Sequence, residues 1–330
     1  MLDIEYAITR VSAAAILTLA LTFSVAAQDL PSWNDGEAKE SIIEFVAAVT
    51  TEGGPEYVEP AERLAVFDND GTLWSEQPMY VQFAFALDRV KAMATDHPEW
   101  NETEPFKSVL AGDKADIAAS GKKGLAEIIA STHAGMTSEQ FTQIVADWIG
   151  SATHPTTDKA YTAMIYHPML ELIDYLKANE FDVYIVSGGG IEFMRPWTEK
   201  TYGIPPQNVV GSSIKIKFEM NDGVPVLNRQ AEVNFVDDGP GKPVGIQTHI
   251  GRKPIAAFGN SDGDIEMLQW VNSGPGRRFA AILHHDDDDR EVAYDRDSHF
   301  GKLDRGLDIA ADENWTLISM KNDWKQVFPE

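Results

Sequence analysis

The stretch from Leu64 to Thr72, which reads LAVFDNDGT, decides how the rest of the chain is interpreted. Its apolar half has the length and composition of a buried strand, which stops at two aspartates followed by a glycine. Because the chain turns where a strand ends, Asp68 and Asp70 can converge on one point at the carboxyl edge of a sheet. In open α/β sheets this edge is where ligands bind. Taken alone, the pattern also fits an acidic turn, whereas an EF-hand calcium loop fits less well because its Gly and Glu positions are not matched.

The composition limits the classes of protein to which this chain can belong. It has 330 residues, of which 43% are hydrophobic, enough for one large domain or a domain with an inserted module. A formal net charge of −25 argues against nucleic-acid binding, which needs clustered Lys and Arg. An acidic surface also repels anionic substrates, so a phosphate site here needs a metal ion or local cations. The absence of cysteine excludes disulfides, thiolate metal sites and cysteine nucleophiles.

The N-terminal residues 1–27 are predicted to be an export signal. Arg10 precedes an apolar run over residues 11–26 and small residues up to Ala27, after which we expect cleavage. The alternative, an uncleaved membrane anchor, fits less well because the run is short for a bilayer span. We therefore expect a periplasmic or secreted protein without a stable membrane span in the mature chain.

The hydrophobic periodicity divides the mature chain into a core and an insertion. Between residues 79 and 162 the patterns are helical only, which predicts an inserted all-helical cap. On either side, over residues 28–78 and 163–330, strands alternate with helices. This alternation predicts an α/β core domain with a doubly wound parallel, Rossmann-like sheet. Strand patterns over 213–220 and 224–226, joined by Asn-Asp-Gly, predict a β-hairpin within the core range.

Two further predicted strands end, like the first, in polar residues beside glycine. One ends at Ser187 and Gly188, and the other in the sequence GNSDGD, which contains Asn260 and Asp264. Lys242 lies between them in the turn GPGKP. Because the carboxyl ends of parallel strands share one edge of the sheet, these groups can meet. A carboxylate nucleophile, a second carboxylate, a hydroxyl donor, a cation and an oxygen-ligated Mg²⁺ together suit phosphoryl transfer.

These residues occur in the order of the four motifs of the haloacid dehalogenase-like superfamily, which the chain resembles. The motifs are the DxDGT of residues 68–72, the strand that ends at Ser187, Lys242, and the acidic GNSDGD of residues 259–264. The second aspartate, Asp70, places the resemblance in the phosphatase branch, and the chain looks like a phosphoserine phosphatase-type enzyme with a helical cap. Four motifs in this order at strand ends are far more specific than DxDGT alone.

The resemblance implies roles for individual residues. Asp68 would attack phosphorus to give an aspartyl phosphate. Asp70 would protonate the leaving alcohol and then activate water. Thr72 and Ser187 would orient these groups, and Ser187 and Gly188 would also bind the substrate.

The resemblance also implies that two cations lie beside Asp68. Lys242 would hold the phosphoryl group and take part in catalysis. Mg²⁺ would bind a carboxylate oxygen of Asp68, the backbone carbonyl of Asp70 and a group from the last motif. Together, Lys242 and Mg²⁺ would lower the pKa of Asp68 more than that of Asp70.

The last motif departs from the family pattern, because Asn260 occupies the position where the common form has a ligating Asp. An amide oxygen can ligate Mg²⁺, but with less charge. We favour Asn260 together with Asp264 as ligands, and Asp262 in place of Asn260 is the alternative. Lys253 is an alternative to Lys242, but it is predicted at the amino end of its strand, the wrong edge of the sheet.

The predicted function is therefore a Mg²⁺-dependent phosphomonoesterase that hydrolyses a small phosphorylated metabolite. One alternative is another phosphoryl-transfer enzyme of the superfamily, a mutase or phosphonatase. The other is a non-catalytic periplasmic binding protein, motivated by the charge missing at Asn260. The aromatic residues Trp74, Tyr80, Trp100 and Trp148 could cage a quaternary ammonium group, although their helical spacing favours core packing for most of them.

Overall fold

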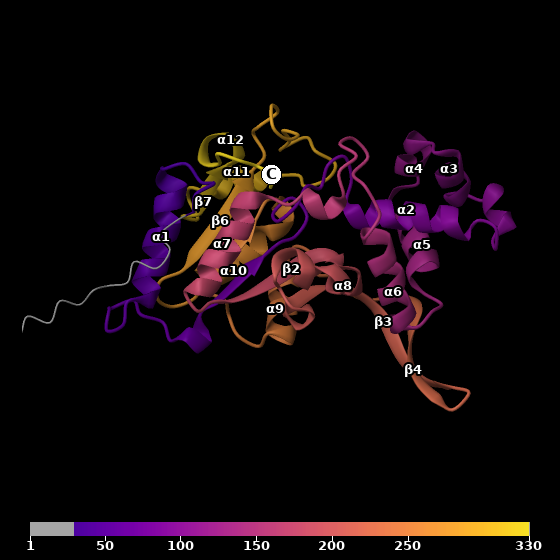
Figure 1. The fold of residues 1–330 in the computed structure, drawn as a ribbon, viewed down its shortest axis with the longest axis horizontal. Coiled ribbons are helices and arrows are strands. Elements are labelled where there is room, and N and C mark those ends of the chain that lie inside the picture. Colours follow the sequence, from indigo (N-terminus) through magenta and orange to yellow (C-terminus); the bar gives the residue numbers. More distant parts are fainter. Residues whose placement is uncertain (1–29, 330) are drawn as a thin grey trace, which may run out of the picture.

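The computed structural model describes residues 30–329, and its centre is a seven-stranded sheet (Figure 1). In spatial order the strands are β4 (Val224–Phe235), β3 (Val209–Asn221), β2 (Asp182–Gly190), β1 (Leu64–Phe67), β5 (Ala256–Gly259), β6 (Phe279–His284) and β7 (Thr316–Ser319). All neighbouring strands are parallel except the antiparallel pair β3 and β4. The predicted export signal lies outside the described residues and stays a prediction. Within 30–329, no helix is long and apolar enough to cross a membrane.

β1 lies at the centre of the sheet, and all of its residues are buried. Ala65 and Phe67 belong to one apolar cluster, whereas Val66 belongs to a second cluster on the opposite face. A strand that is buried on both faces needs no polar alternation, which explains its unbroken apolar run. Asp68 follows at once, and its backbone N–H donates to the carbonyl of Phe258 over 2.9 Å. The first motif thus begins where the central strand ends, as predicted.

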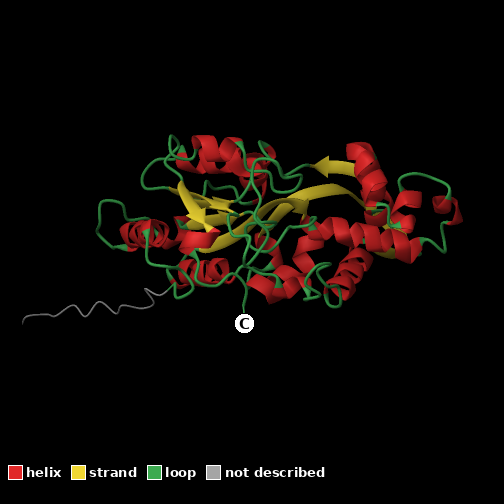
Figure 2. Cartoon of the chain, turned by 90° about the horizontal axis from the view of Figure 1, so that it is seen from above, coloured by secondary structure: helices red, strands yellow, loops and turns green. Residues whose placement is uncertain are grey.

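Helices cover both faces of the sheet (Figure 2). The helices are α1 (Glu37–Thr50), α2 (Val81–Met93), α3 (Phe106–Ala111), α4 (Lys114–Ala119), α5 (Gly121–His133), α6 (Ser138–Ile149), α7 (His167–Ala178), α8 (Ile191–Tyr202), α9 (Gly241–His249), α10 (Ile265–Asn272), α11 (Arg305–Ile309) and α12 (Met320–Asp323). α1, α7 and α8 contribute to the cluster on the Phe67 side, and α9 and α10 contribute to the cluster on the Val66 side. The predicted α/β fold with a doubly wound, mostly parallel sheet is confirmed.

The segment between β1 and α7 consists of α2 to α6, with no named strand among its described residues. Most of it has an apolar cluster of its own, which includes Val90, Trp100, Phe106 and Ile128. Two of these helices also join the larger cluster of the core, α2 through Val81 and Phe85 and α6 through side chains such as Phe141. This arrangement agrees with a helical cap, and the boundaries 28–78, 79–162 and 163–330 stay predictions.

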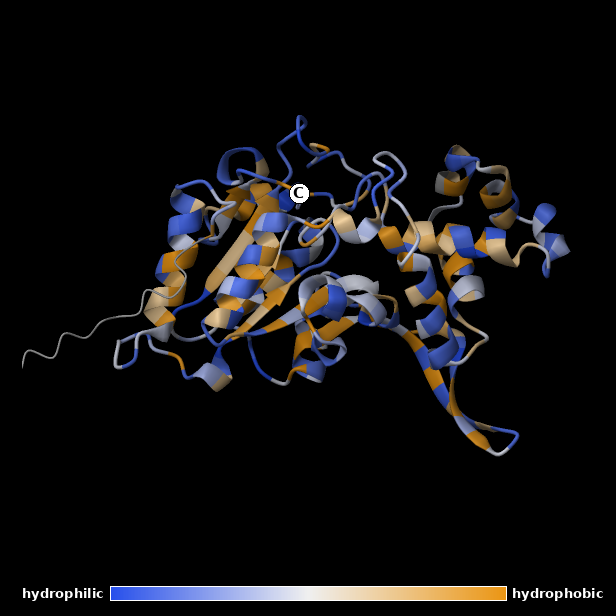
Figure 3. Cartoon of the chain, viewed as in Figure 1, coloured by the Kyte–Doolittle hydropathy of each residue, from blue (hydrophilic) through white to orange (hydrophobic). Residues whose placement is uncertain are grey.

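The β3–β4 hairpin is longer than the sequence predicts, because β4 continues to Phe235 instead of stopping at Val226. Along the extension, apolar residues such as Leu227 and Val233 alternate with polar ones such as Asn228, as the alternating colours of Figure 3 show. Successive side chains of a strand point to opposite faces, so only every second residue here is apolar. The sequence therefore shows no continuous apolar run that would mark this strand.

Arg229 joins this hairpin to the helical segment. Its Nε donates to the carbonyl of His133 over 2.6 Å, and its guanidinium lies over the ring of Phe141, 3.9 Å from the centroid. It also forms an ion pair with Glu192 of α8. The side chain is 5% exposed. The hairpin, which the sequence places in the core range, therefore contacts both the core and the cap.

Candidate active site

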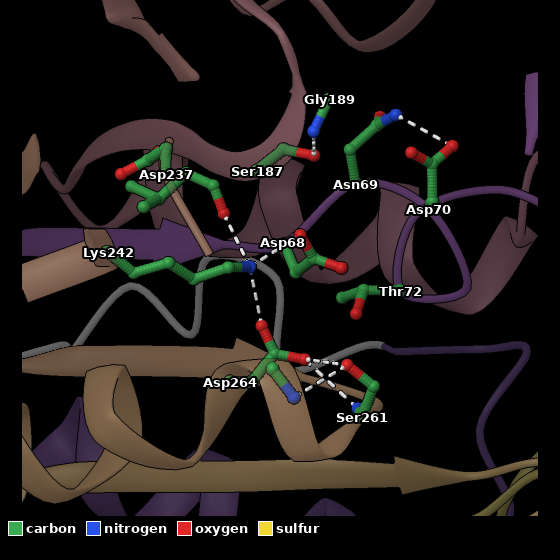
Figure 4. A network of polar contacts seen from close by, with 12 residues as sticks. Asp68, Asn69, Asp70, Thr72, Ser187, Gly189, Asp237, Lys242, Ser261 and Asp264 are labelled. Carbon is green, nitrogen blue, oxygen red and sulfur yellow. Dashed lines mark hydrogen bonds and ion pairs between the residues drawn. The ribbon is translucent and has the colours of Figure 1, made fainter. Parts of the chain in front are cut away.

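Lys242 lies at the centre of the strand-end residues that the sequence singles out (Figure 4). Its Nζ is 2.7 Å from Asp68 Oδ1 and 2.6 Å from Asp264 Oδ1, and it donates to the carbonyl of Val186 over 3.0 Å. The side chain is 2% exposed. Asp68 follows β1, Val186 lies in β2 directly before Ser187, and Asp264 follows β5, so the carboxyl edge of the sheet brings these partners together.

Asp264 holds Lys242 and its own turn. Its Oδ2 accepts from the backbone N–H groups of Asn260 and Ser261, each over 3.0 Å, and from Ser261 Oγ over 3.2 Å. With Lys242 on Oδ1, protein donors engage both oxygens of this carboxylate. In the structure Asp264 therefore holds Lys242 in place, and its role as a metal ligand stays a prediction.

The two alternatives that the sequence leaves open lie elsewhere. Asp262 accepts from the backbone N–H groups of residues 304–306 over 2.9 to 3.2 Å, at the start of α11. Lys253 donates to Ser273 Oγ over 3.0 Å. Both side chains are therefore engaged away from the strand-end cluster.

Asn260 is held in one orientation by two neighbours. Thr72 Oγ1 donates to Asn260 Oδ1 over 3.0 Å, and Asn260 Nδ2 donates to Glu76 Oε1 over 2.7 Å. Tyr294 OH donates to the same Glu76 oxygen over 2.6 Å. Asn260 and Glu76 are each 1% exposed. Burial raises the pKa of Glu76 well above its ordinary value, and the bonds from Tyr294 and Asn260 oppose the rise.

Asp70 lies beside this cluster with its own hydrogen bonds. Its Oδ1 accepts from Trp74 Nε1 over 2.7 Å and from Asn69 Nδ2 over 3.4 Å. Burial raises the pKa of Asp70 to about 6, and the bond from Trp74 and the charge of Lys242 oppose the rise. A carboxyl group with such a pKa can give and take a proton near neutral pH.

The pKa of Asp68 depends on burial and on two charged neighbours. Burial raises it above its ordinary value, the charge of Lys242 acts in the opposite direction, and the carboxylate of Asp264 adds to the rise. Lys242 shares its single charge between the two carboxylates and does not by itself offset the burial. That Lys242 together with Mg²⁺ lowers this pKa stays a prediction.

Ser187 and the glycines after it border the same site. β2 continues to Gly190, past the predicted end, with a register break after Ser187. Ser187 Oγ accepts from the N–H of Gly189 over 3.1 Å, and the N–H of Gly190 donates to Gln82 Oε1 over 2.6 Å. Side chains therefore engage two of the N–H groups that a phosphate cradle would use. Gly188 lines the same cavity as Asp68 and Lys242.

A cavity of about 870 Å³ connects these residues to the cap and the hairpin. Asp68, Asp70, Ser187 and Lys242 line one end of it. Thr72, Asn260 and Asp264 are buried behind that end. Among residues 30–329, no three His, Asp or Glu side chains are grouped to hold a metal ion.

Most of the described chain matches the model of one protein family. The model described as haloacid dehalogenase-like hydrolase matches residues 65–269. The chain belongs to this family. The matched range contains every catalytic and metal-site residue predicted from the sequence. No curated protein sequence matches the chain.

Solved structures that resemble this haloacid dehalogenase-like chain share little sequence with it. A protein of unknown function from Anaerococcus prevotii DSM 20548 has a TM-score of 0.51 at 15% identity, over 76% of this chain and 86% of that one. A protein of unknown function from Bordetella pertussis Tohama I has 0.48 at 13%, over 78% and 98%. A phosphoserine phosphohydrolase-like protein from Francisella tularensis subsp. tularensis SCHU S4 has 0.39 at 14%, over 76% and 98%. The first supports the shared fold alone.

Two acidic residues of the site escape the sequence analysis. Glu76 follows the first motif in a stretch without periodicity, so no strand-end or helical signal marks it. Asp237 precedes the Lys242 turn and is completely buried, and neither of its carboxylate oxygens has a hydrogen-bond partner among the described residues. Burial raises the pKa of Asp237 to about 7, against the charge of Lys242. Only the adjacent pair Asp237-Asp238 is visible in the sequence, and it reads as a turn.

Proposed function

We propose that this protein is a Mg²⁺-dependent phosphomonoesterase that acts through an aspartyl phosphate on Asp68. The arrangement that carries the proposal is Lys242 between Asp68 and Asp264 at the end of an open cavity, with Asp70 beside it. Membership of a hydrolase family supports the reaction class. A non-catalytic binding protein would not need a second carboxyl group with a pKa of about 6 next to the first.

In this proposal each side chain has one task. Asp68 attacks phosphorus, and the phosphorus–oxygen bond to the alcohol breaks. Asp70 gives its proton to the leaving oxygen. It later takes a proton from a water that attacks phosphorus, so that the bond between Asp68 and phosphorus breaks and inorganic phosphate leaves. Lys242 and Ser187 hold the non-bridging oxygens, and Asp264 keeps Lys242 in place.

The oxygen donors at the site suit Mg²⁺, which prefers carboxylate and carbonyl ligands. The Asp68 carboxylate, the backbone carbonyl of Asp70 and Asn260 Oδ1 are the atoms that would hold it. The bond from Asn260 Nδ2 to Glu76 supports this choice, because it turns the amide oxygen away from Glu76. When bound, the cation offsets the charge between the phosphate and the nucleophile.

Hydrolysis of p-nitrophenyl phosphate with Mg²⁺, and after removal of Mg²⁺ with EDTA, tests the proposal. We expect activity that depends on Mg²⁺ and that falls by at least about 10³-fold in Asp68→Asn. Asp262→Asn is the matched control, since Asp262 lies in the last motif but faces α11. Equal activity of Asp68→Asn and wild type would contradict the mechanism. Binding of phosphomonoesters without any hydrolysis would favour the non-catalytic alternative.

We also propose export to the periplasm or the medium, which rests on the sequence of residues 1–27. N-terminal sequencing of the mature protein tests it. A chain that starts at Gln28 is expected, and one that keeps residues 1–27 would contradict it.

A further inference from the structure

The cavity that begins at Lys242 has apolar walls at its far end. Helices of the cap supply one wall, and the β3–β4 hairpin supplies the other. The apolar lining includes Phe83, Leu125 and Ile129 from the cap, and Ile214, Ile216 and Val233 from the hairpin. A phosphoryl group at Asp68 would thus have apolar surface on the side of its leaving group.

Several of these side chains are exposed to solvent. Leu125 is 42% exposed, Ile216 is 44% exposed and Val233 is 61% exposed, although all three line one cavity. Exposed apolar side chains gathered around a cavity mark a binding surface for an apolar group. Because the same cavity contains the proposed nucleophile, the occupant that fits best is the alcohol part of the substrate.

The charged side chains in this half of the cavity are already engaged. Arg229 pairs with Glu192, and Lys215 pairs with Glu232 over 2.5 Å. Arg195 donates to backbone carbonyls, the nearer one over 2.9 Å. A carboxylate on the leaving group would therefore meet only cations whose charge another side chain or backbone carbonyl already shares.

His133 and Gln82 add polar atoms but no charge. Burial lowers the pKa of His133 to about 3, with the nearby Arg229 as the next cause, so the ring is neutral at pH 7. Its Nε2 lies 3.1 Å from Gln82 Nε2, so the ring accepts there and carries its proton on Nδ1, next to Thr132 Oγ1 at 2.8 Å. The polar groups are satisfied by one another, which leaves the apolar walls to receive the ligand.

An aromatic cage for a quaternary ammonium group, the less favoured alternative to core packing, is not assembled at this cavity. Trp74 stacks on Trp197 and Trp100 stacks on Phe106, each pair with centroids 4.4 Å apart. Of the four aromatic residues singled out in the sequence, only Tyr80 is among the residues that line the cavity.

We propose that the substrate is the phosphomonoester of an uncharged, largely apolar alcohol, an alkyl chain that lies between α5 and the β3–β4 hairpin. This inference rests on the proposed function for the position of the phosphate. The cavity volume of about 870 Å³ is in the range that holds drug-sized ligands, which is more than a phosphorylated amino acid needs.

The binding of n-alkylphosphonates from ethyl to octyl, measured by calorimetry in the presence of Mg²⁺, tests the inference without hydrolysis. We expect the affinity to rise with chain length, by at most about fourfold per methylene group, the factor for complete burial. The non-hydrolysable phosphonate analogues of phosphoserine and phosphocholine should bind more weakly than octylphosphonate. An affinity that does not change with chain length, or tighter binding of the charged ligands, would overturn the inference.

The hairpin offers a matched pair of variants. Val233 and Val224 both lie on β4, with exposed fractions of 61% and 59%, but only Val233 lines the cavity. Val233→Asn should weaken octylphosphonate binding by about three- to tenfold and reduce the dependence on chain length. Val224→Asn should leave both unchanged. Equal effects of the two substitutions would contradict the assigned wall.

Hydrolysis separates this inference from the function on which it rests. Chain-length-dependent binding without any turnover of alkyl phosphates would refute the phosphatase and leave the apolar site standing. Turnover of ethyl and p-nitrophenyl phosphate without any preference for longer chains would leave the phosphatase standing and refute the apolar site.

Discussion

The side-chain amide of Asn260 donates to Glu76 Oε1 over 2.7 Å, and this bond sets the direction of the amide. In the reverse orientation the amide oxygen of Asn260 would face Glu76 Oε1. Both side chains are buried, so an acceptor would lack a hydrogen-bond donor. The bond thus directs Asn260 Oδ1 toward Thr72, whose hydroxyl donates to it over 3.0 Å. Glu76 is a positioning residue in this account, because it acts on the cation through Asn260.

Replacing Glu76 should weaken Mg²⁺ binding only if the new side chain cannot accept the hydrogen bond from Asn260 Nδ2. Glu76→Leu removes the acceptor, so we expect Mg²⁺ to bind about 10- to 100-fold more weakly, as for other residues that orient metal ligands. Glu76→Gln keeps an oxygen for the amide and should stay within about threefold of wild type. Calorimetric titration of the apo protein measures both. Equal losses in the two variants would mean that charge, not orientation, is what Glu76 supplies.

Replacing Asn260 by aspartate should test the contact between residue 260 and Glu76 from the other side. Asn260→Asp places two carboxylates in contact, so we expect the melting temperature to fall and one of the two to keep a proton. Adding Glu76→Gln supplies a donor and should restore the melting temperature. The double variant should also bind Mg²⁺ more tightly than wild type, since the new ligand carries charge. If the two substitutions destabilise additively, the proposed contact is absent.

Asp237 should make the protein less stable as the pH rises. Its pKa is about 7 in the folded chain and 3.8 in the unfolded chain, so the folded state binds a proton more tightly. The free energy of unfolding therefore decreases as the pH rises from about 4 through 7. Asp237→Asn removes this cost, and we expect a gain of about 2 to 4 kcal/mol at pH 8 that disappears below pH 4.

Urea unfolding of wild type and Asp237→Asn at pH 4, 6 and 8 measures this effect. Asp288→Asn serves as the control, because Asp288 is exposed and is not among the charges that act on Asp237, so its replacement should change the stability by less than about 0.5 kcal/mol. A gain in Asp237→Asn that is the same at pH 4 and pH 8 would contradict titration of Asp237 as its cause.

The protonated form of Asp70 should be needed most for poor leaving groups. With a pKa of about 6, Asp70 loses its proton as the pH rises through this value, so kcat/KM for an alkyl phosphate should decline above about pH 6. The same ratio for p-nitrophenyl phosphate should decline less, because nitrophenolate leaves without a proton. Asp70→Asn should lower the rate for the alkyl ester by about 10²- to 10⁴-fold and that for the aryl ester by less. Parallel pH profiles for both esters would contradict the role of Asp70 as the acid.

The sequence predicts the parts of the site that follow from the topology of a parallel sheet. Asp68 and the GNSDGD turn follow buried strands, and Ser187 lies where the predicted strand ends, so the strand-end rule brings them to one edge with Lys242. The rule also favours Lys242 over Lys253 correctly, because only the former reaches Asp68.

The remaining features depend on tertiary contacts that no local pattern encodes. Glu76 lies in a loop and reaches Asn260 only because the fold buries both. Asp264 matches the motif, but its oxygens accept hydrogen bonds from Lys242 and from backbone N–H groups of its own turn. The spacing of residues in the motif does not reveal these bonds. The extension of β4 beyond Val226 is not predicted, because it is mostly exposed and its apolar residues alternate with polar ones.

The central claim is that Asp68 forms a covalent phosphate, and acid quenching during turnover followed by peptide mapping tests it most directly. Asp70→Asn is the suitable background, because slower hydrolysis of the intermediate lets it accumulate. We predict a hydroxylamine-sensitive phosphate on the peptide that contains Asp68, and none in Asp68→Asn. Phosphate on a different residue, or undiminished turnover by Asp68→Asn, would contradict the account.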